Sequence, residues 1–161
     1  MCSSDLLFSH PESGQIDRIR TLQIDQILEH QRNLNSAVLI AGDLNAGPGV
    51  SDSNFRQILT AGFVSLHDFL HGEVLEPTWD PLNALNIEGP HKHCPPQRID
   101  HVFVRRNDIE TARITPISSE VCLKNPVVPI VTKKNVSVSD HYGLLTELEI
   151  GSTAGSVLAA D

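Results

Sequence analysis

Four short segments carry side chains that could bind a cation and move a proton. They read Gly-Asp-Leu-Asn at 42–45, Pro-Thr-Trp-Asp at 77–80, Arg-Ile-Asp-His at 98–101 and Ser-Asp-His at 139–141. Hard divalent cations prefer oxygen ligands, and a histidine beside a carboxylate is favoured in its charged form. Each segment alone is a weak signal. Asp43 and Asn45 after a strand are typical of a turn, and Asp140 with His141 fits a cap or turn equally well.

Asp100 is the hardest of these residues to assign to a turn. In an extended strand it points to the same side as Val102 and Val104, so its carboxylate faces an apolar layer and needs a partner. His141 and His101 both qualify by residue type, and the spacing does not decide between them. We interpret His101 as a surface histidine, because it lies on the face opposite Asp100.

The elements that would position these segments are read from apolar periodicity. Strands are predicted at 6–8, 37–41, 98–104, 112–117 and 142–150, and the continuous run at 37–41 is typical of a strand buried on both faces. A short helix is predicted at 53–61. A longer helix is predicted at 15–31, where one broad face carries Ile16, Ile19, Ile24, Ile27 and Leu28. Residues 75–97 should form a long loop, and 151–161 a flexible tail.

The composition is that of a globular chain with one substantial core. The 161 residues are 40% hydrophobic and carry a formal charge of -8, which disfavours tight, sequence-independent binding to duplex DNA. Cys2, Cys94 and Cys122 form neither an even set nor a C-x-x-C pair, so we predict free thiols. No apolar run is long enough to cross a bilayer and no signal peptide is visible, which leaves localisation open.

Taken together and in this order, the four segments resemble the endonuclease/exonuclease/phosphatase superfamily of DNase I-like enzymes. Residues 42–45 match its G-D-x-N, residues 139–141 its S-D-H, and residues 98–101 its R-I-D-Y with His101 in place of Tyr. Residues 78–80 resemble its less strict T-x-D. The resemblance implies an α+β fold, the DNase I-like four-layer α/β/β/α sandwich, with residues 1–150 forming only the C-terminal part of that domain. Ser9 and His10, followed by Arg18 and Gln23, look similar to sphingomyelinase-like members.

The resemblance also implies an activity: hydrolysis of phosphoester bonds, in particular phosphodiesters, with Mg²⁺ or Mn²⁺ as cofactor. Asp43 would orient or deprotonate the attacking water, and Asn45 would help to hold the phosphate. Asp100 would orient His141, which would stabilise the charge that develops on the phosphate in the transition state. The residue types suit this chemistry, because phosphoryl hydrolysis needs mainly positioning and charge neutralisation.

Further roles follow from the same resemblance. Asp140, together with Asp43, would bind the metal, directly or through water. His10 would contact the phosphate or protonate the leaving oxygen. Thr78 and Trp79 are candidate substrate contacts, although a lone tryptophan more often packs in a core. The substrate could be a nucleic acid, a sphingolipid head group or a small phosphoester.

One feature of the family pattern is not found in this sequence. In the family, an Asn and a metal-binding Glu come from the N-terminal half, upstream of anything that matches Ser9. We therefore expect the chain to be the C-terminal half of the fold, to lack one metal ligand, and to be inactive without the missing N-terminal half.

Two rival interpretations remain open. His91, His93 and Cys94 lie close together in the loop and could bind zinc, although their spacing is unlike common zinc motifs. Alternatively, the chain could be a catalytically inactive fragment or binding module with the same fold.

Overall fold

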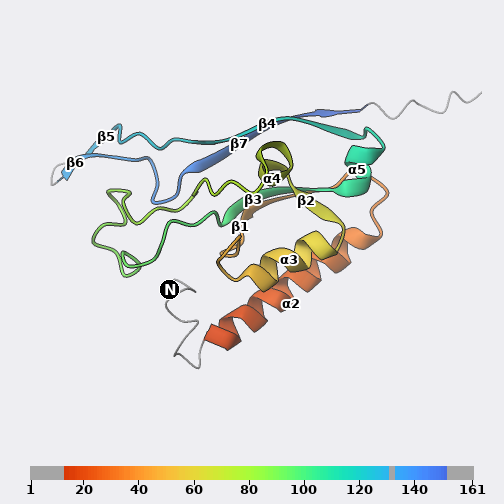
Figure 1. Cartoon of the computed structure of the whole chain (residues 1–161), viewed down its shortest axis with the longest axis horizontal. Helices are drawn as coiled ribbons and strands as arrows, with labels where there is room; N and C mark the ends of the chain where they lie inside the picture. Colours follow the sequence, from red (N-terminus) through yellow and green to blue (C-terminus); the bar gives the residue numbers. More distant parts are fainter. Residues whose placement is uncertain (1–12, 131–132, 152–161) are drawn as a thin grey trace, which may run out of the picture.

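The computed structural model describes residues 13–130 and 133–151 (Figure 1). The helices are α2 (Ser13–Arg32), α3 (Asp52–Thr60), α4 (Leu66–His71) and α5 (Arg106–Glu110). The strands are β1 (Leu39–Asp43), β2 (Phe63–Ser65), β3 (Asp100–Arg105), β4 (Ile114–Cys122), β5 (Val128–Ile130), β6 (Lys133–Val136) and β7 (Gly143–Ile150). The predicted strand at 6–8, His10 and nearly all of the predicted tail lie outside the described residues.

The strands form two antiparallel sheets and a hairpin. One sheet has the order β1-β3-β2, the second pairs β4 with β7, and β5 pairs with β6. Figure 1 shows α2 and α3 on one side of the first sheet and β4 and β7 on the other side. Helix α4 contacts both β3 and β4, so it links the two sheets. The described residues therefore form a helical layer followed by two layers of sheet.

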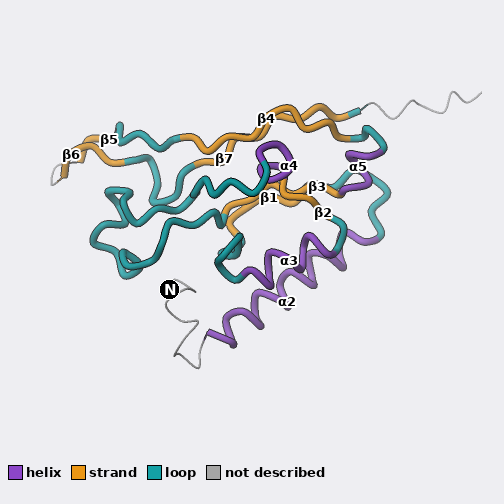
Figure 2. Tube along the Cα trace, in the orientation of Figure 1, coloured by secondary structure: helices purple, strands orange, loops and turns teal. Residues whose placement is uncertain are grey.

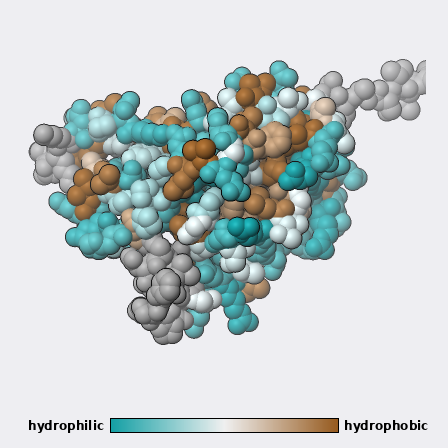
Figure 3. All heavy atoms as spheres, in the orientation of Figure 1, coloured by the Kyte–Doolittle hydropathy of each residue, from teal (hydrophilic) through white to brown (hydrophobic). Residues whose placement is uncertain are grey.

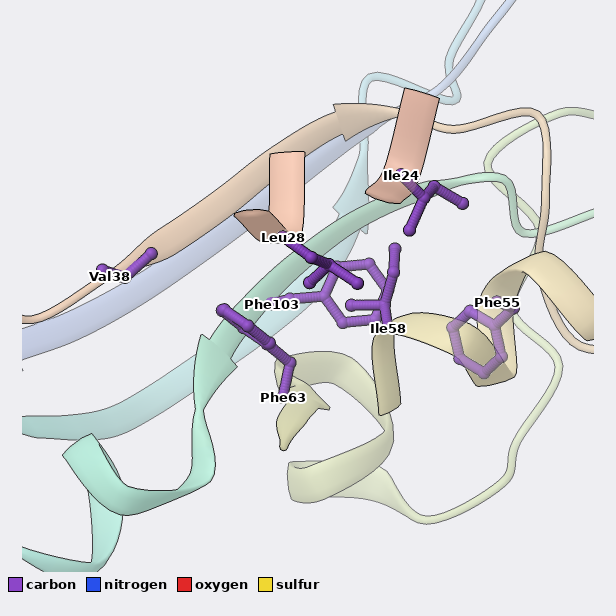
Figure 4. Close-up of a cluster of buried hydrophobic side chains, with 7 residues drawn as sticks. All are labelled: Ile24, Leu28, Val38, Phe55, Ile58, Phe63 and Phe103. Atoms are coloured by element: carbon purple, nitrogen blue, oxygen red, sulfur yellow. The ribbon is translucent and has the colours of Figure 1, made fainter. Parts of the chain in front are cut away.

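The main core lies between the first sheet and helices α2 and α3 (Figure 4). Its buried members are Ile24, Leu28, Val38, Phe55, Ile58, Phe63 and Phe103. A second cluster on the opposite face of the sheet contains Val64, Leu66, Val104 and Ile114. The alternation of side chains along β3 explains both clusters, because Phe103 and Val104 point to opposite faces. The position of β3 at the centre of the sheet therefore anchors the segment that carries Asp100.

Helix α2 buries a narrower stripe than the periodicity predicts. Ile24 and Leu28, which are four residues apart, lie in the core, whereas Ile19 is 56% exposed and Ile27 is 41% exposed. A groove between α2 and β1 is lined by several of these exposed apolar side chains and reaches Asp43 at its end. Within the described residues, nothing covers this part of the helix.

The prediction that residues 37–41 are buried on both faces is wrong. Val38 is buried, but Leu39 is 45% exposed and Ala41 is also exposed. The physical reason is that β1 is an edge strand, which pairs with β3 alone among the described strands. An apolar run of this kind needs a neighbour on each side to be fully covered.

Residues 72–99 contain no helix and no strand, which confirms the loop predicted at 75–97 (Figure 2). In Figure 1 this loop segment and the β5–β6 hairpin lie at the same end of the molecule, on the left of the view. On the face seen in Figure 3, hydrophobic side chains are interspersed with hydrophilic ones. None of the helices in the described residues has the length and apolar character needed to span a membrane.

Candidate active site

Asp43 ends β1, and Asn45 follows in a tight turn. The backbone N–H of Asn45 donates to Asp43 Oδ1 at 2.8 Å, and the side-chain amide of Asn45 donates to Asp43 Oδ2 at 3.1 Å. Asn45 has a positive φ of 48°, a conformation that asparagine tolerates better than most residues. The turn interpretation of this pair is thus correct. The turn also holds both polar groups together on the exposed end of the strand.

The register of the first sheet brings a second carboxylate to the same place. Strand β1 runs antiparallel to β3, and Asp43 lies directly opposite Asp100. Residues opposite each other on neighbouring strands project their side chains to the same face about 5 Å apart. Two acids separated by 57 positions in the sequence therefore become neighbours through strand pairing alone.

His141 is the histidine that pairs with Asp100. Its Nδ1 lies 2.8 Å from Asp100 Oδ2, and both side chains are partly buried. The segment that carries His141 is held against residues 78–79. The backbone of His141 forms a β-bridge with Trp79, and the N–H of Tyr142 donates to the carbonyl oxygen of Thr78 at 2.6 Å.

This pairing shifts both pKa values toward the charged state. The hydrogen bond to Asp100 raises the pKa of His141 against the opposing effect of burial, and the negative charges of Asp43 and Asp140 raise it further. Burial alone would raise the pKa of Asp100, but hydrogen bonds from His141 and Thr78 outweigh it, so that pKa lies below its ordinary value. The pairing therefore favours the imidazolium form of His141 and the carboxylate form of Asp100.

Asp43, Asp100 and His141 together could hold a metal ion. One ligand atom from each lies within 4.8 Å of the others, and theirs is the only such group of three in the described part of the chain. Two of the three donors are carboxylates, which suits a hard divalent cation. Asp140 is exposed and lies outside this group. Its Oδ1 accepts a hydrogen bond from Ser139, and its charge still acts on His141.

Thr78 and Trp79 are not placed as direct substrate contacts. Thr78 is fully buried, and its Oγ1 accepts the backbone N–H groups of Ile99 and Asp100 at 3.1 Å each. The ring of Trp79 is buried with Val50, Cys94 and Ile99. Thr78 thus fixes the backbone of Asp100, and Trp79 packs in the apolar cluster beside it.

His101 is a core residue, so its interpretation as a surface histidine is wrong. It does face away from Asp100, but that face is covered by Phe55 of α3, and His101 is only 2% exposed. Its Nε2 lies 2.9 Å from the carbonyl oxygen of Ala46, which a neutral ring with hydrogen on Nε2 can donate to. Burial lowers the pKa of His101 to about 4. This ring therefore supports the loop after Asn45 rather than taking part in proton transfer.

The loop after Asn45 also lies close against the backbone of Arg98. A Cβ at Gly47 would collide with the carbonyl oxygen of Arg98, so only glycine allows the two segments to lie this close. Arg98 itself is 1% exposed, forms an ion pair with Asp68 of α4 and donates to the carbonyl oxygen of Val74 at 2.7 Å. The two acidic segments of the site are thus fastened to each other and to α4.

The rival zinc interpretation lacks its thiolate ligand. Cys94 is disulfide-bonded and buried, so the prediction that it is a free thiol is wrong, and its sulfur is not available as a zinc ligand. Cys122 is a free thiol, as predicted. Three cysteines allow one bridge and one unpaired thiol, so the odd count alone did not exclude a disulfide.

Sequence reasoning missed two asparagines in the loop between Asp80 and Ile87. The side chains of Asn83 and Asn86 are buried and donate to backbone carbonyl groups of residues 139 and 140. A polar loop contains many asparagines that face water, and the sequence offers no signal that separates buried ones from these.

Comparison with known proteins identifies the family and the fold. The family model described as Endonuclease/Exonuclease/phosphatase family matches residues 5–141. No curated protein matches the chain. Among solved structures, TDP2 from D. rerio, complexed with single strand DNA product, is 23% identical with a TM-score of 0.62, over 83% of this chain and 50% of that chain. A 3'-5' exonuclease (NExo) from Neisseria meningitidis is 15% identical with a TM-score of 0.60, over 88% of this chain and 56% of that chain.

The chain thus spans about half the length of the solved structures that it matches. Their similarity establishes the DNase I-like fold, in agreement with the α+β class that the sequence predicts. The family match covers all four acidic, amide or histidine segments, including the three that meet at Asp43, Asp100 and His141. The chain belongs to the endonuclease/exonuclease/phosphatase family.

Proposed function

We propose that this chain carries the catalytic residues of a magnesium-dependent phosphodiesterase. The observation that carries the proposal is the group formed by Asp43, Asp100 and His141, in which an acid that could activate water lies beside a histidine whose pKa is raised by its hydrogen bond to Asp100. The family of the chain supports a hydrolase that acts on phosphoester bonds in general. That the bond is a phosphodiester and that the cation is Mg²⁺ are our proposals beyond the family match.

In the proposed mechanism, Asp43 acts on the attacking water, and Asn45 and His141 act on the phosphate oxygens. Asp43 accepts a proton from the attacking water or orients that water toward phosphorus. Asn45, fixed by its bond to Asp43, donates its amide to a phosphate oxygen. His141 presents Nε2, the ring nitrogen not bonded to Asp100, to a non-bridging oxygen and stabilises its growing negative charge. His10 lies outside the described residues and keeps its expected role at the leaving oxygen as a proposal.

Asp43 and Asp140 are the residues we assign to Mg²⁺, with Mn²⁺ as a substitute. The abundance of carboxylate oxygens fits a hard cation, and the exposed position of both acids leaves room for bound water. When bound, the ion would neutralise charge on the phosphate and lower the pKa of a coordinated water.

We further propose that a complete site needs a polypeptide segment beyond this chain, and that the chain alone is inactive. Two observations support this. The outer edge of β1 is unpaired among the described strands, and the apolar groove between α2 and β1 opens beside Asp43 and Asn45. A segment packed there would bring additional groups within reach of the cation site.

The substrate class is a phosphodiester whose alcohol part is not specified by these residues. The names of the two structural neighbours refer to single strand DNA product and to an exonuclease, which makes nucleic acid the first substrate to test. A net charge of -8 argues for a short or single-stranded substrate rather than tight binding along a duplex. Sphingomyelin and bis(p-nitrophenyl) phosphate are the other two substrates to compare.

The test is hydrolysis of these three substrates with Mg²⁺, by this chain and by the longest protein that contains it. Asp43→Asn and His141→Gln should each lower kcat by about 100- to 10,000-fold in the active form. Asp52→Asn at a half-buried position of α3 and His30→Gln at an exposed position of α2 make the same chemical changes away from the site and should leave kcat unchanged. Equal activity of the Asp43 variant and the Asp52 control would refute the assignment.

A further inference from the structure

In the loop from Asp80 to Ile87, the usual burial of apolar and polar side chains is reversed. Its apolar side chains face solvent, with Leu82 79% exposed and Ile87 53% exposed, while Asn83 and Asn86 are almost completely buried. Burying a side-chain amide is costly unless its hydrogen-bonding groups find partners. The partners of these two amides therefore indicate what the loop is built to hold.

Both amides bind the backbone of the segment that carries Asp140 and His141. Asn83 Nδ2 donates to the carbonyl oxygens of Ser139 at 3.0 Å and Asp140 at 3.3 Å. Asn86 Nδ2 donates to the carbonyl oxygens of Asp80 and Asp140, each at 2.9 Å. The carbonyl oxygen of Asp140 thus accepts from both asparagines.

The segment at 139–141 needs such donors because it belongs to neither a strand nor a helix. Strand β7 begins at Gly143, so the carbonyl groups of Ser139 and Asp140 have no partners in a regular sheet or helix. The segment is also fixed by the bridge between His141 and Trp79, by the bond from the N–H of Tyr142 to the carbonyl oxygen of Thr78, and by its own bond from the N–H of His141 to Ser139 Oγ at 3.2 Å. The amides act at the residue directly before His141.

We infer that Asn83 and Asn86 are positioning residues that set the orientation of His141 toward Asp100 and toward the reacting phosphate. Their hydrogen bonds to this segment go to the backbone carbonyl groups of residues 139 and 140 and to no catalytic side chain. This inference rests on the proposed function for its catalytic consequence. Its structural part, the control of the His141–Asp100 hydrogen bond, stands independently.

The experiment compares Asn86→Ala and Asn83→Ser with two controls. Asn107→Ala removes an exposed asparagine of α5, and Ile58→Val weakens the distant core without touching the site. The first readout is the proton NMR signal of the hydrogen-bonded Nδ1–H of His141 in the metal-free protein. The second is kcat and KM for bis(p-nitrophenyl) phosphate with Mg²⁺ in the longest available protein.

Both loop variants should broaden or remove the His141 signal and lower kcat by about 10- to 100-fold, with little change in KM. Ile58→Val should keep the signal and kcat even where its Tm falls as far as that of the loop variants. If a loop variant keeps both the His141 signal and the wild-type kcat, the inference is wrong. If Asn86→Ala does not fold, Asn83→Ser retains a hydroxyl donor and decides the matter. Absence of hydrolysis by the wild type would refute the proposed function, while the NMR comparison would still test the positioning role.

Discussion

Replacing His101 should change how the stability of this protein depends on pH. The ring is 2% exposed, packs against Phe55 and Phe103, and donates to Ala46, so it is held neutral in the folded state. Burial lowers its pKa from 6.5 to about 4. In the unfolded chain the same ring takes up a proton near its ordinary pKa. The unfolded state therefore binds more protons in this range, and the free energy of unfolding falls as pH drops from 6.5 toward 4.

The size of the effect follows from that shift. A difference of one pKa unit corresponds to about 1.4 kcal/mol, so the full shift is worth about 3 kcal/mol. Between about pH 7 and about pH 4.5, roughly 2 kcal/mol of the free energy of unfolding should be lost through His101. The pKa of His67 is also lowered, mainly by burial, and adds to the loss. The raised pKa of His141 acts in the opposite direction, which is why a comparison of variants is needed.

The assay is urea denaturation of the wild type and of His101→Gln at both pH values. Glutamine keeps a neutral amide donor for Ala46 but does not titrate. The variant should be less stable than the wild type at neutral pH, because it loses the ring contacts, yet its stability should fall by roughly 2 kcal/mol less on acidification. His30→Gln, at an exposed position of α2, should retain the wild-type pH dependence. The same pH dependence in His101→Gln as in the wild type would show that this ring is not held neutral.

Three further predictions concern the site. Asp100→Asn removes the main cause of the raised pKa of His141, so the loss of kcat at alkaline pH should begin at a lower pH than in the wild type. An unchanged dependence of kcat on pH would indicate that the two groups do not act as a pair. Gly47→Ala should destabilise the fold by about 1–3 kcal/mol in urea denaturation, because the new Cβ meets the backbone of Arg98, while Gly14→Ala meets nothing and should not. EDTA should abolish hydrolysis and added Mg²⁺ or Mn²⁺ should restore it; activity that survives chelation would exclude the proposed cofactor.

The elements that carry chemistry could be predicted because their local patterns are strong. The helix predicted at 15–31 is α2, the strand predicted at 98–104 overlaps β3, and the strand predicted at 142–150 is β7. The short elements β2, α4, α5, β5 and β6 were not predicted. They have three to six residues each and too little periodicity to stand out.

The site itself could be predicted by residue type but not by geometry. The register that sets Asp43 opposite Asp100 is a long-range property of strand pairing, and local sequence contains little of it. The alternation along β3 placed His101 on the face away from Asp100. It could not show that Phe55, from a helix 46 positions earlier, would cover that face.

Burial explains the remaining differences. Thr78 and Trp79 were expected to contact substrate because they precede an acid in the matched segment, but both side chains are buried. Thr78 binds the backbone N–H groups of residues 99 and 100, and Trp79 packs in an apolar cluster. The run at 37–41 was expected to be buried because it is apolar throughout. Its exposure reflects its place at the edge of the sheet, which depends on the neighbours of β1 and not on its own residues.

The most direct test of the account is a crystal structure of the active protein grown with Mn²⁺ and phosphate. We expect a manganese anomalous peak beside the carboxylates of Asp43 and Asp140, with the phosphate within hydrogen-bonding distance of Asn45 and of Nε2 of His141. Manganese found only at acids elsewhere on the surface, or a phosphate that avoids His141, would contradict the claim that these residues form one phosphodiesterase site.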